Sequence, residues 1–211
     1  MELADIRRDY RLKEMDENQI SRNPMELFEM WLNEAFDAKA NEPTAMVLAT
    51  ATPGGDPAAR IVLLKAFSEA GFGFFTNYLS RKGEEITINQ KVALLFHWPE
   101  LERQVRIEGR ARRTSAAVSD EYFNSRPFES RLSAVISKQS QQVPDRDHLE
   151  RLWSGRQNET VENRVARPFF WGGYNVEPLK IEFWQGRPNR LHDRILYAST
   201  GRDWVISRLA P

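Results

Sequence analysis

The chain has 211 residues, of which 41% are hydrophobic and 11% aromatic, so it is long enough to bury one sizeable core and fits a single domain. It contains 30 lysines and arginines and 30 aspartates and glutamates, and its formal net charge is therefore zero. This balance argues against a general nucleic-acid surface or an anionic-membrane surface, so any phosphate recognition must be local. The absence of cysteine excludes a disulfide framework, a thiolate metal site and a thiol nucleophile.

The start of the chain, Met1 to Asp5, lacks a signal-peptide pattern, and no apolar run approaches membrane-spanning length. Together with the lack of cysteine, this predicts a cytoplasmic protein that makes no membrane contact. The three histidines show no metal-ligand spacing, so we expect no bound metal.

Residues 1–22 are rich in charge and poor in core-forming residues, which predicts a mobile N-terminal arm. We expect residues 23–211 to form a single domain. Its first helix begins at Asn23-Pro24, because Asn is a good N-cap and Pro is favoured at the first helical position. The apolar face of this helix carries Leu27, Phe28, Trp31, Leu32, Ala35 and Phe36.

From Ala45 the hydrophobic period changes to that of strands. The pattern predicts a hairpin of strands 45–50 and 59–67, then strands over 73–76, 92–98 and 102–113. Short strands with tight turns are typical of an antiparallel barrel or sandwich. The remaining sequence predicts helices over 115–125, 129–137 and 145–157, and strands over 169–176, 179–184, 191–197 and 204–209.

An apolar stretch with a cation at each end, Arg60 to Lys65, is the first candidate site. The segment Ile61 to Leu64 is aliphatic enough to be a buried strand, which would hold Arg60 and Lys65 in fixed positions. Strict alternation places the two cations on opposite faces of the strand. Either a bulge intervenes or the two cations serve different groups.

A helix predicted over 81–89 adds to this candidate site. Ser80 is a suitable N-cap, the free backbone N–H groups of the first turn attract an anion, and Arg81 and Lys82 add positive charge. With Arg60 and Lys65, this pattern predicts a site for a phosphate monoester. The alternative for the stretch taken alone is a core strand flanked by solvated cations.

Further downstream, Tyr122, Arg126 and Ser130 are spaced by four residues and would share one face of an unbroken helix. Pro127 breaks such a helix. A helix that ends here, followed by a new helix that starts near Ser130, would still bring the three donors together close to a helix N-terminus. The alternative places Tyr122 at the edge of the core and Arg126 as a solvated cap.

Arg190, His192 and Arg194 alternate along a predicted strand, so they would project from the same face. Three cationic or titratable groups on one face are unfavourable unless they meet an anion or a polar ligand. The alternative for His192 alone is a hydrogen-bonded structural histidine.

From Arg7 to Pro211 the chain resembles the pyridoxine (pyridoxamine) 5'-phosphate oxidase family. The resemblance is carried by short motifs that follow one another in order: Arg60-Ile-Val-Leu-Leu-Lys65, Ser80-Arg81-Lys82, Leu101-Glu-Arg-Gln-Val105, Tyr122-Phe-Asn-Ser-Arg126-Pro127, Ser137-Lys-Gln-Ser140, Phe170-Trp-Gly-Gly173, Ile181-Glu-Phe-Trp-Gln-Gly186, Arg190-Leu-His-Asp-Arg194 and Arg208-Leu-Ala-Pro211.

The resemblance implies a mainly β fold with helices (α+β), an FMN-binding antiparallel split β-barrel with peripheral helices. It also implies a homodimer that binds FMN at the subunit interface. The expected reaction is the oxidation of pyridoxine 5'-phosphate or pyridoxamine 5'-phosphate by O2 to pyridoxal 5'-phosphate and H2O2, with ammonia released from the amine, as part of vitamin B6 metabolism.

The resemblance also implies roles for individual residues. It assigns FMN binding to Arg60, Ile61, Val62, Leu63, Leu64, Lys65, Phe75, Thr76, Arg81, Lys82, Gln104, Gln139, Ser140, Trp184 and Arg194. It assigns substrate binding to Lys65, Tyr122, Arg126, Ser130, Arg190 and His192, with Arg7 and Tyr10 as a lid, and catalysis to Arg190 and His192.

The sequence departs from the family pattern at Phe75, where the family usually has Tyr, and matches it poorly over 11–21 and 157–167. Two alternatives remain open. One is a split-barrel flavoprotein oxidase or reductase that acts on another substrate, and the second phosphate cluster argues against it. The other is a non-catalytic module that binds FMN or pyridoxal phosphate, and the pair Arg190 and His192 argues against it.

Overall fold

A computed structural model of the protein describes residues 9–16, 20–159 and 165–211. Its strands are β1 (Ala45–Ala51), β2 (Pro57–Leu63), β3 (Ala66–Ser68), β4 (Gly71–Asn77), β5 (Lys91–Trp98), β6 (Arg103–Arg113), β7 (Trp171–Gln185), β8 (Asp193–Ser199) and β9 (Trp204–Arg208). Its helices are α1 (Pro24–Asp37), α2 (Arg81–Ile88), α3 (Ala116–Ser125), α4 (Phe128–Ile136) and α5 (Arg146–Glu159), with short 3-10 helices η2 (Pro99–Leu101) and η3 (Pro188–Arg190).

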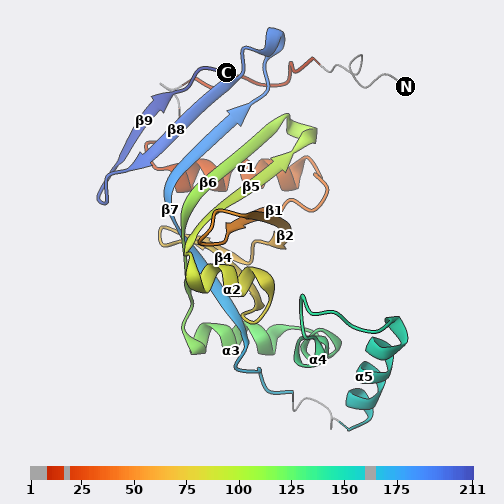
Figure 1. Ribbon diagram of the computed structural model, residues 1–211. Helices are drawn as coiled ribbons and strands as arrows, with labels where there is room; N and C mark the ends of the chain where they lie inside the picture. The colour runs from red at the N-terminus through yellow and green to blue at the C-terminus, as the bar shows by residue number, and fades with distance from the viewer. Residues whose placement is uncertain (1–8, 17–19, 160–164) are drawn as a thin grey trace.

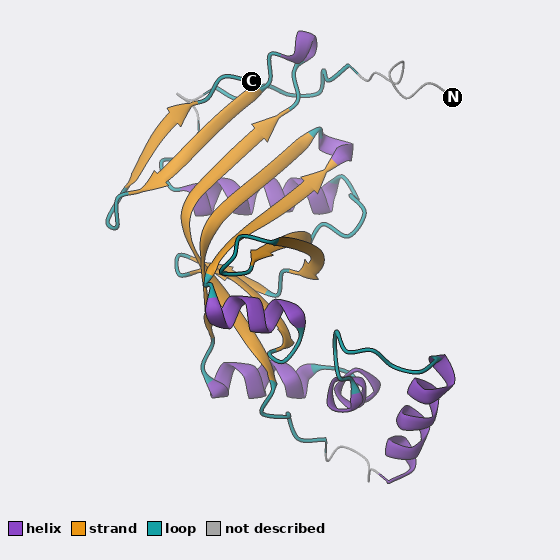
Figure 2. Cartoon of the chain, in the orientation of Figure 1, coloured by secondary structure: helices purple, strands orange, loops and turns teal. Residues whose placement is uncertain are grey.

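The strands of the described residues form one antiparallel sheet in the order β2-β1-β5-β6-β7-β4-β3, and β8 and β9 extend it from β7. The sheet curls into a half-open barrel, α1 lies against one face, and α3, α4 and α5 lie beyond the end where β7 begins (Figures 1 and 2). This arrangement confirms the predicted α+β class. None of the helices in these parts of the chain is long and apolar enough to cross a membrane.

The core forms where α1 covers the curled sheet. Asn23 caps α1 by accepting a hydrogen bond from the backbone N–H of Met25 at 2.9 Å, as its sequence predicts. Phe28 of α1 is fully buried and meets the rings of Phe72 and Phe96 edge-on, with centroids 4.9 and 5.1 Å apart. These contacts fix the helix to the sheet and leave the sheet's outer edges free to carry a site.

The prediction that Ile61 to Leu64 form a buried strand is wrong for the single chain. Among the described residues, strand β2 pairs only with β1, so no strand forms hydrogen bonds with its outer edge. Ile61 is 61% exposed and Leu63 38%, whereas Leu64, just after the strand, is buried. The apolar character of β2 therefore signals a surface that another molecule can cover.

The predicted strand 59–67 is divided at Leu64 and Lys65. The backbone N–H of Leu64 donates to Thr44 at 2.9 Å, and that of Lys65 donates to Gly73 at 2.8 Å. The chain thus leaves the neighbourhood of β1 and joins β4 within two residues. This break resolves the alternation problem, because Arg60 and Lys65 now line the same cavity.

Strand β7 is one continuous strand where two were predicted. Its register with β6 shifts between Glu108 and Gly109, where Leu179 is the extra residue of β7. Its neighbour Pro178 has no N–H to donate to the ladder. The first part of β7 pairs with β4 and the last part pairs with β8. Strand β7 therefore connects two distant ends of the molecule (Figure 1).

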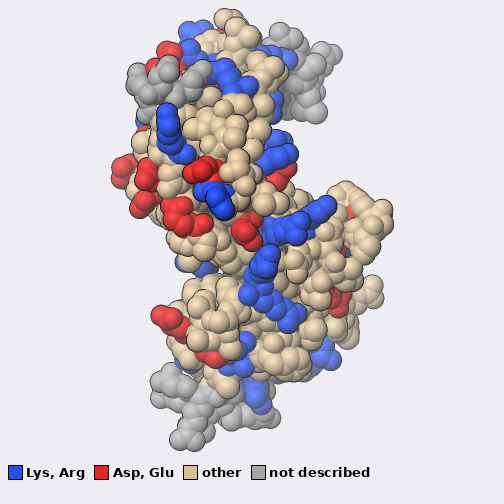
Figure 3. Space-filling view, turned by 90° about the vertical axis from the view of Figure 1, so that its left-hand side faces the viewer, with Lys and Arg blue, Asp and Glu red and all other residues tan. Residues whose placement is uncertain are grey.

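On the face shown in Figure 3, basic and acidic side chains are interspersed. This distribution agrees with the formal net charge of zero. Basic residues that gather around one cavity are therefore informative, and such a group is found.

Candidate functional site

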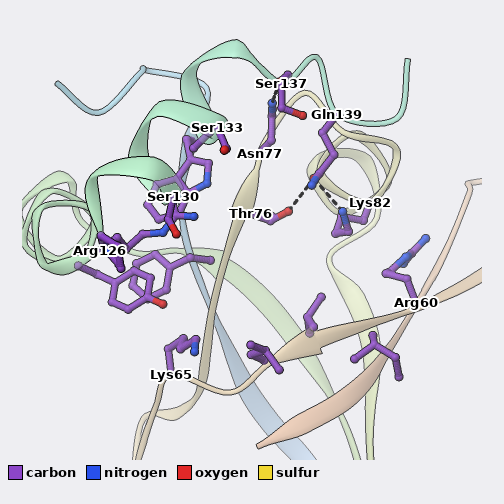
Figure 4. A pocket seen from close by; sticks show the side chains of 18 residues that line it. Arg60, Lys65, Thr76, Asn77, Lys82, Arg126, Ser130, Ser133, Ser137 and Gln139 are labelled. Atoms are coloured by element: carbon purple, nitrogen blue, oxygen red, sulfur yellow. Dashed lines mark hydrogen bonds between the residues drawn. The ribbon is translucent and has the colours of Figure 1, made fainter. Parts of the chain in front are cut away.

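A cavity of about 770 Å³ lies between β2, β4 and the helices α3 and α4 (Figure 4). Its lining residues are Arg60, Ile61, Val62, Leu63, Lys65, Phe75, Thr76, Asn77, Lys82, Tyr122, Arg126, Pro127, Ser130, Ser133, Ala134, Ser137, Gln139 and Trp171. Most of the predicted phosphate-binding residues are thus brought together. Figure 4 shows Arg60 and Lys82 on one side of the cavity, and Arg126, Ser130 and Lys65 on the other.

On the first side, Arg60 is held by a buried carboxylate. Its guanidinium donates to Thr50 Oγ1 at 2.5 Å and to Glu85 Oε2 at 3.2 Å. Glu85 also accepts hydrogen bonds from the Thr50 hydroxyl and from Arg81 Nε, the latter at 2.8 Å. Burial alone would raise the pKa of Glu85, but these hydrogen bonds outweigh it and hold the pKa below its usual range. Arg81 turns toward Glu85 and is not part of the cavity lining.

Lys82 projects into the same side of the cavity from the first turn of α2. Ser80 caps this helix by accepting from Gly83 N, as predicted. Lys82 Nζ donates to Gln139 Oε1 at 2.9 Å, and the hydroxyl of Thr76 donates to the same oxygen at 3.2 Å. Burial, and then the charge of Arg60, lower the pKa of Lys82. Two cations held this close together favour an anion between them.

On the opposite side, Tyr122, Arg126 and Ser130 converge as their spacing predicts. Helix α3 ends at Ser125 and α4 begins at Phe128, so the N-terminal turn of α4 faces the cavity. Arg126 Nη1 is buried and has no hydrogen-bond partner among the described residues. Burial lowers the pKa of Arg126, and Tyr122 offsets this in part. A buried unpaired guanidinium nitrogen is unfavourable, and an anion on this side of the cavity would supply the missing partner.

Aromatic rings hold these donors in place. The rings of Phe75 and Tyr122 stack with centroids 3.9 Å apart and an interplanar angle of 22°. Trp171 stacks on Phe75 at 5.6 Å, and the guanidinium of Arg126 lies over the Trp171 ring at 4.8 Å. Phe75 lacks the hydroxyl that the family usually has here, but its ring still orients Tyr122.

Three other predicted residues, Tyr10, Gln104 and Trp184, line a smaller cavity of about 220 Å³. Its lining residues are Tyr10, His97, Pro99, Glu102, Gln104 and Trp184. The ring of His192 lies 4.6 Å from that of Trp184 and 5.7 Å from that of Tyr10. Arg7 lies outside the described residues.

The prediction that Arg190 and His192 share a strand face is wrong. Arg190 ends the 3-10 helix η3 with a positive φ of 61°, as does Asn189 with 57°, and β8 begins only at Asp193. Pro188 and the two positive φ angles form a turn that an alternating pattern does not reveal. His192 instead accepts a hydrogen bond at Nδ1 from the backbone N–H of Arg187, at 3.1 Å.

Two groups near this turn have shifted pKa values. Burial, and then the positive charge of Arg190, lower the pKa of His192, so its ring is neutral near neutral pH. Arg194 donates to Glu182 Oε1 at 2.8 Å, and this hydrogen bond raises the pKa of Arg194. It also donates to the carbonyl of Ala210 at 2.8 Å. Arg194 is thus held close to the chain terminus.

The two groups of residues are far apart in one chain. Phe75 pairs with Gly173 near the start of β7, and Gln104 pairs with Trp184 near its end. Gly173 and Trp184 are 11 residues apart, which corresponds to about 36 Å along an extended strand. The two groups therefore lie toward opposite ends of β7.

Sequence reasoning missed several residues of the larger cavity: Asn77, Ser133, Ser137 and Trp171 line it, and Glu85 holds its cations. A signal existed for Glu85, which follows Arg81 by four residues on a predicted helix, and for Ser133, which lies one turn after Ser130. Of the residues predicted for the phosphate side, Leu64 is buried, and it is absent from the cavity lining together with Arg81 and Ser140.

Comparisons with known proteins cover nearly the whole chain. Residues 32–152 match the model of the pyridoxamine 5'-phosphate oxidase family, and residues 171–211 match that of the pyridoxine 5'-phosphate oxidase C-terminal dimerisation region. A pyridoxine/pyridoxamine 5'-phosphate oxidase from Cyanothece sp. is 50% identical over 99% of this chain and 98% of its own. Another from Rubrobacter xylanophilus is 52% identical over 100% of this chain and 97% of its own.

Solved structures of related proteins have a similar fold. PhzG from Burkholderia lata 383, crystallised with tetrahydrophenazine-1-carboxylic acid, is 31% identical, with a TM-score of 0.87 over 92% of this chain and 95% of its own. A pyridoxamine 5'-phosphate oxidase-related, FMN binding protein from Nostoc punctiforme shares the fold, with a TM-score of 0.72 at 16% identity over 91% of this chain and 100% of its own. Because full-length relatives and both family models span the residues around the two cavities, the chain belongs to the pyridoxine/pyridoxamine 5'-phosphate oxidase family.

Proposed function

We propose that the protein is a homodimer that binds FMN between its subunits and oxidises pyridoxine 5'-phosphate or pyridoxamine 5'-phosphate to pyridoxal 5'-phosphate. In this reaction O2 is reduced to H2O2, and the amine substrate also consumes water and releases ammonia. The observation that carries the proposal is the larger cavity, which presents separate basic groups on two opposite sides. FMN and the substrate each bring one phosphate, so a site for both needs two anion-binding places.

The residues of the cavity fit this pair of ligands. Arg60 and Lys82, held by Glu85 and Gln139, suit the phosphate of FMN, because their positions are fixed before the ligand arrives. Arg126, whose Nη1 is buried and unpaired, suits the phosphate of the substrate. On this side the substrate phosphate would also meet Lys65, Tyr122 and Ser130.

A homodimer supplies the rest of the site. Gln104, Trp184, Arg190, His192 and Arg194 lie at the far end of β7 from the cavity of their own chain. A two-fold axis would let this end of one chain meet the larger cavity of its partner, since each surface is used twice in a closed dimer. The exposed apolar edge at Ile61 and Leu63 and the match of residues 171–211 to a dimerisation region support this assembly.

FMN, when bound, supplies a two-electron acceptor that O2 can reoxidise. The protein's part is to position the substrate and to exclude water. Because Nδ1 of His192 accepts a backbone N–H, the proton of the neutral ring is on Nε2, which can donate to a polar atom of the substrate. Arg190, next to it, supplies a fixed positive charge.

An anaerobic absorbance experiment tests the function. Pyridoxine 5'-phosphate should bleach the visible band of the bound flavin, and air should restore the band as pyridoxal 5'-phosphate appears. A flavin that binds but does not bleach would contradict the substrate assignment and favour a flavoprotein that acts on another substrate or a non-catalytic FMN-binding module. Protein that binds no flavin would contradict the proposal entirely.

Mixed dimers test the shared site. Arg126→Ala and Arg190→Ala subunits should each have little activity alone at a substrate concentration well below the wild-type KM. Refolded together at equal amounts, they should recover roughly a quarter of the wild-type activity, because half of the dimers are mixed and each of these has one intact site. Mixtures that stay inactive would mean that both residues act from the same chain.

A further inference from the structure

We infer that Glu102 is a positioning residue that anchors the N-terminal arm, and that Gly186 provides the space in which Tyr10 of the arm is held against His192. This inference rests on the proposed function, in which Tyr10 belongs to the substrate site. It assigns to Glu102 and Gly186 a task that neither the sequence motifs nor the comparisons give them.

The first observation is a pair of hydrogen bonds to one carboxylate. Glu102 Oε2 accepts from the backbone N–H of Arg11 at 2.8 Å and from that of Leu12 at 3.1 Å. Glu102 is buried, with 4% of its surface exposed. Hydrogen bonds to an ionised group are stronger than those between neutral groups. They fix the backbone of the arm immediately after Tyr10.

The second observation is the backbone of Glu102 itself. It follows η2 with a φ of 55° and a ψ of 40°, the left-handed conformation, which is unfavourable for a residue with a long side chain. Asn or Gly would fit this position with less strain. A long side chain at a strained backbone position points to a function for that side chain. The hydrogen bonds of Glu102 with the arm are such a function.

The third observation is the close approach of Tyr10 to Gly186. A Cβ atom at Gly186 would lie 2.6 Å from Tyr10 Cγ and 2.8 Å from Tyr10 Cβ, which are its nearest atoms among the described residues other than its chain neighbours. The ring of Tyr10 also meets those of Trp184 and His192 edge-on, each at 5.7 Å. Gly186 N donates to the carbonyl of Glu102 at 2.8 Å, so the anchor and the space for the ring form one unit.

The consequence is that Glu102 acts on the substrate through Tyr10. With the backbone of Arg11 and Leu12 fixed, Tyr10 forms one wall of the smaller cavity, beside Trp184. Without the anchor the arm would have to be ordered by the substrate itself, and that cost would weaken binding. Flavin binding and the folded core should be unaffected.

The test uses three variants of the FMN-loaded, full-length protein. Glu102→Gln keeps the size of the side chain and removes its charge, Glu102→Asn also suits the left-handed backbone, and Gly186→Ala pushes Tyr10 away. Glu100→Gln is the matched control, because its carboxylate accepts from Asn41 N at 3.1 Å and not from the arm.

Two measurements are made on each variant. The KM for pyridoxine 5'-phosphate should rise about tenfold, while kcat stays within about twofold of the wild-type value. Trypsin should cleave the chain after Arg11 about tenfold faster, because a tenfold change corresponds to 1.4 kcal/mol of free energy for docking of the arm. The control should match the wild type in both. Glu102→Asn should also keep or raise the melting temperature, which loss of a purely structural residue would not do.

The effects of Glu102→Gln and Tyr10→Ala on KM should not multiply, because the two residues act as one unit. Multiplicative effects, or unchanged cleavage in Glu102→Gln, would overturn the inference. So would loss of flavin in Glu102→Gln while Gly186→Ala behaves like the wild type, since Glu102 would then support the fold. The cleavage assay needs no turnover, so it tests the anchor even if the proposed oxidation fails.

Discussion

Replacement of Glu85 by Gln would test whether one buried carboxylate holds the cations of the larger cavity in place. The Glu85 side chain is 7% exposed and accepts hydrogen bonds from Thr50, Arg60 and Arg81. Gln keeps the size of the side chain and one acceptor oxygen, but it removes the negative charge. The two arginines would then face each other without a counterion.

The expected loss of stability follows from the exposure of the partners. Removing one partner of a fully buried ion pair costs about 3–5 kcal/mol. Here the Arg81 side chain is 61% exposed and the Arg60 side chain 20% exposed, so water screens part of the interaction. We therefore expect a loss of about 2 kcal/mol in the free energy of unfolding. For a chain of this length, this lowers the melting temperature by about 4–8 °C.

Urea unfolding at fixed protein concentration and at two pH values is the decisive assay. Hydrogen bonds from Thr50, Arg81 and Arg60 outweigh burial and hold the folded pKa of Glu85 below 4.5. Such a group stabilises the fold fully above its unfolded pKa, and this stabilisation is lost as the pH falls through the folded pKa.

The difference between the wild type and Glu85→Gln should therefore be full at about pH 7 and shrink below about pH 4. The same difference at both pH values would mean that the charge of Glu85 contributes nothing. No difference at neutral pH would refute the reasoning from burial and hydrogen bonding altogether.

Three further substitutions test the substrate side. Arg126→Gln should raise the KM for pyridoxine 5'-phosphate about 10- to 100-fold at unchanged flavin content, because a charge-assisted hydrogen bond contributes about 1.5–3 kcal/mol; an equal rise with unphosphorylated pyridoxine would contradict this. Trp171→Leu should raise the same KM about threefold to tenfold by removing the cation–π contact with Arg126, and a wild-type KM would show that the ring only fills space. Burial and Arg190 lower the pKa of His192, so kcat/KM of the wild type should stay level as the pH falls through 6.5 and decrease only at lower pH. Arg190→Gln should shift this decrease to higher pH. An unshifted decrease would mean that a group other than His192 titrates.

Features set by neighbouring residues were predictable from the sequence. The helix starts at Asn23 and Ser80 follow from local capping chemistry, and both are confirmed. The spacing of Tyr122, Arg126 and Ser130 predicted their convergence in spite of Pro127, because a new helix begins at once.

Features set by distant contacts were not predictable in the same way. The exposure of Ile61 depends on β2 lying at the sheet edge, and strand order is a property of the whole chain. The hydrogen bond between Arg60 and Glu85 joins residues 25 positions apart. The turn at Arg190 depends on positive φ angles, and these are hard to predict from the sequence at residues other than Gly.

The open edge of β2 has a consequence for biosynthesis. A newly made chain carries unpaired backbone groups beside exposed Ile61 and Leu63, which is the kind of edge that invites wrong pairing between chains. In the proposed homodimer this edge is removed from water only by meeting a second copy, a step whose rate depends on concentration. Dimer assembly and aggregation therefore compete for the same strand edge, and this competition begins as soon as the new chain has folded.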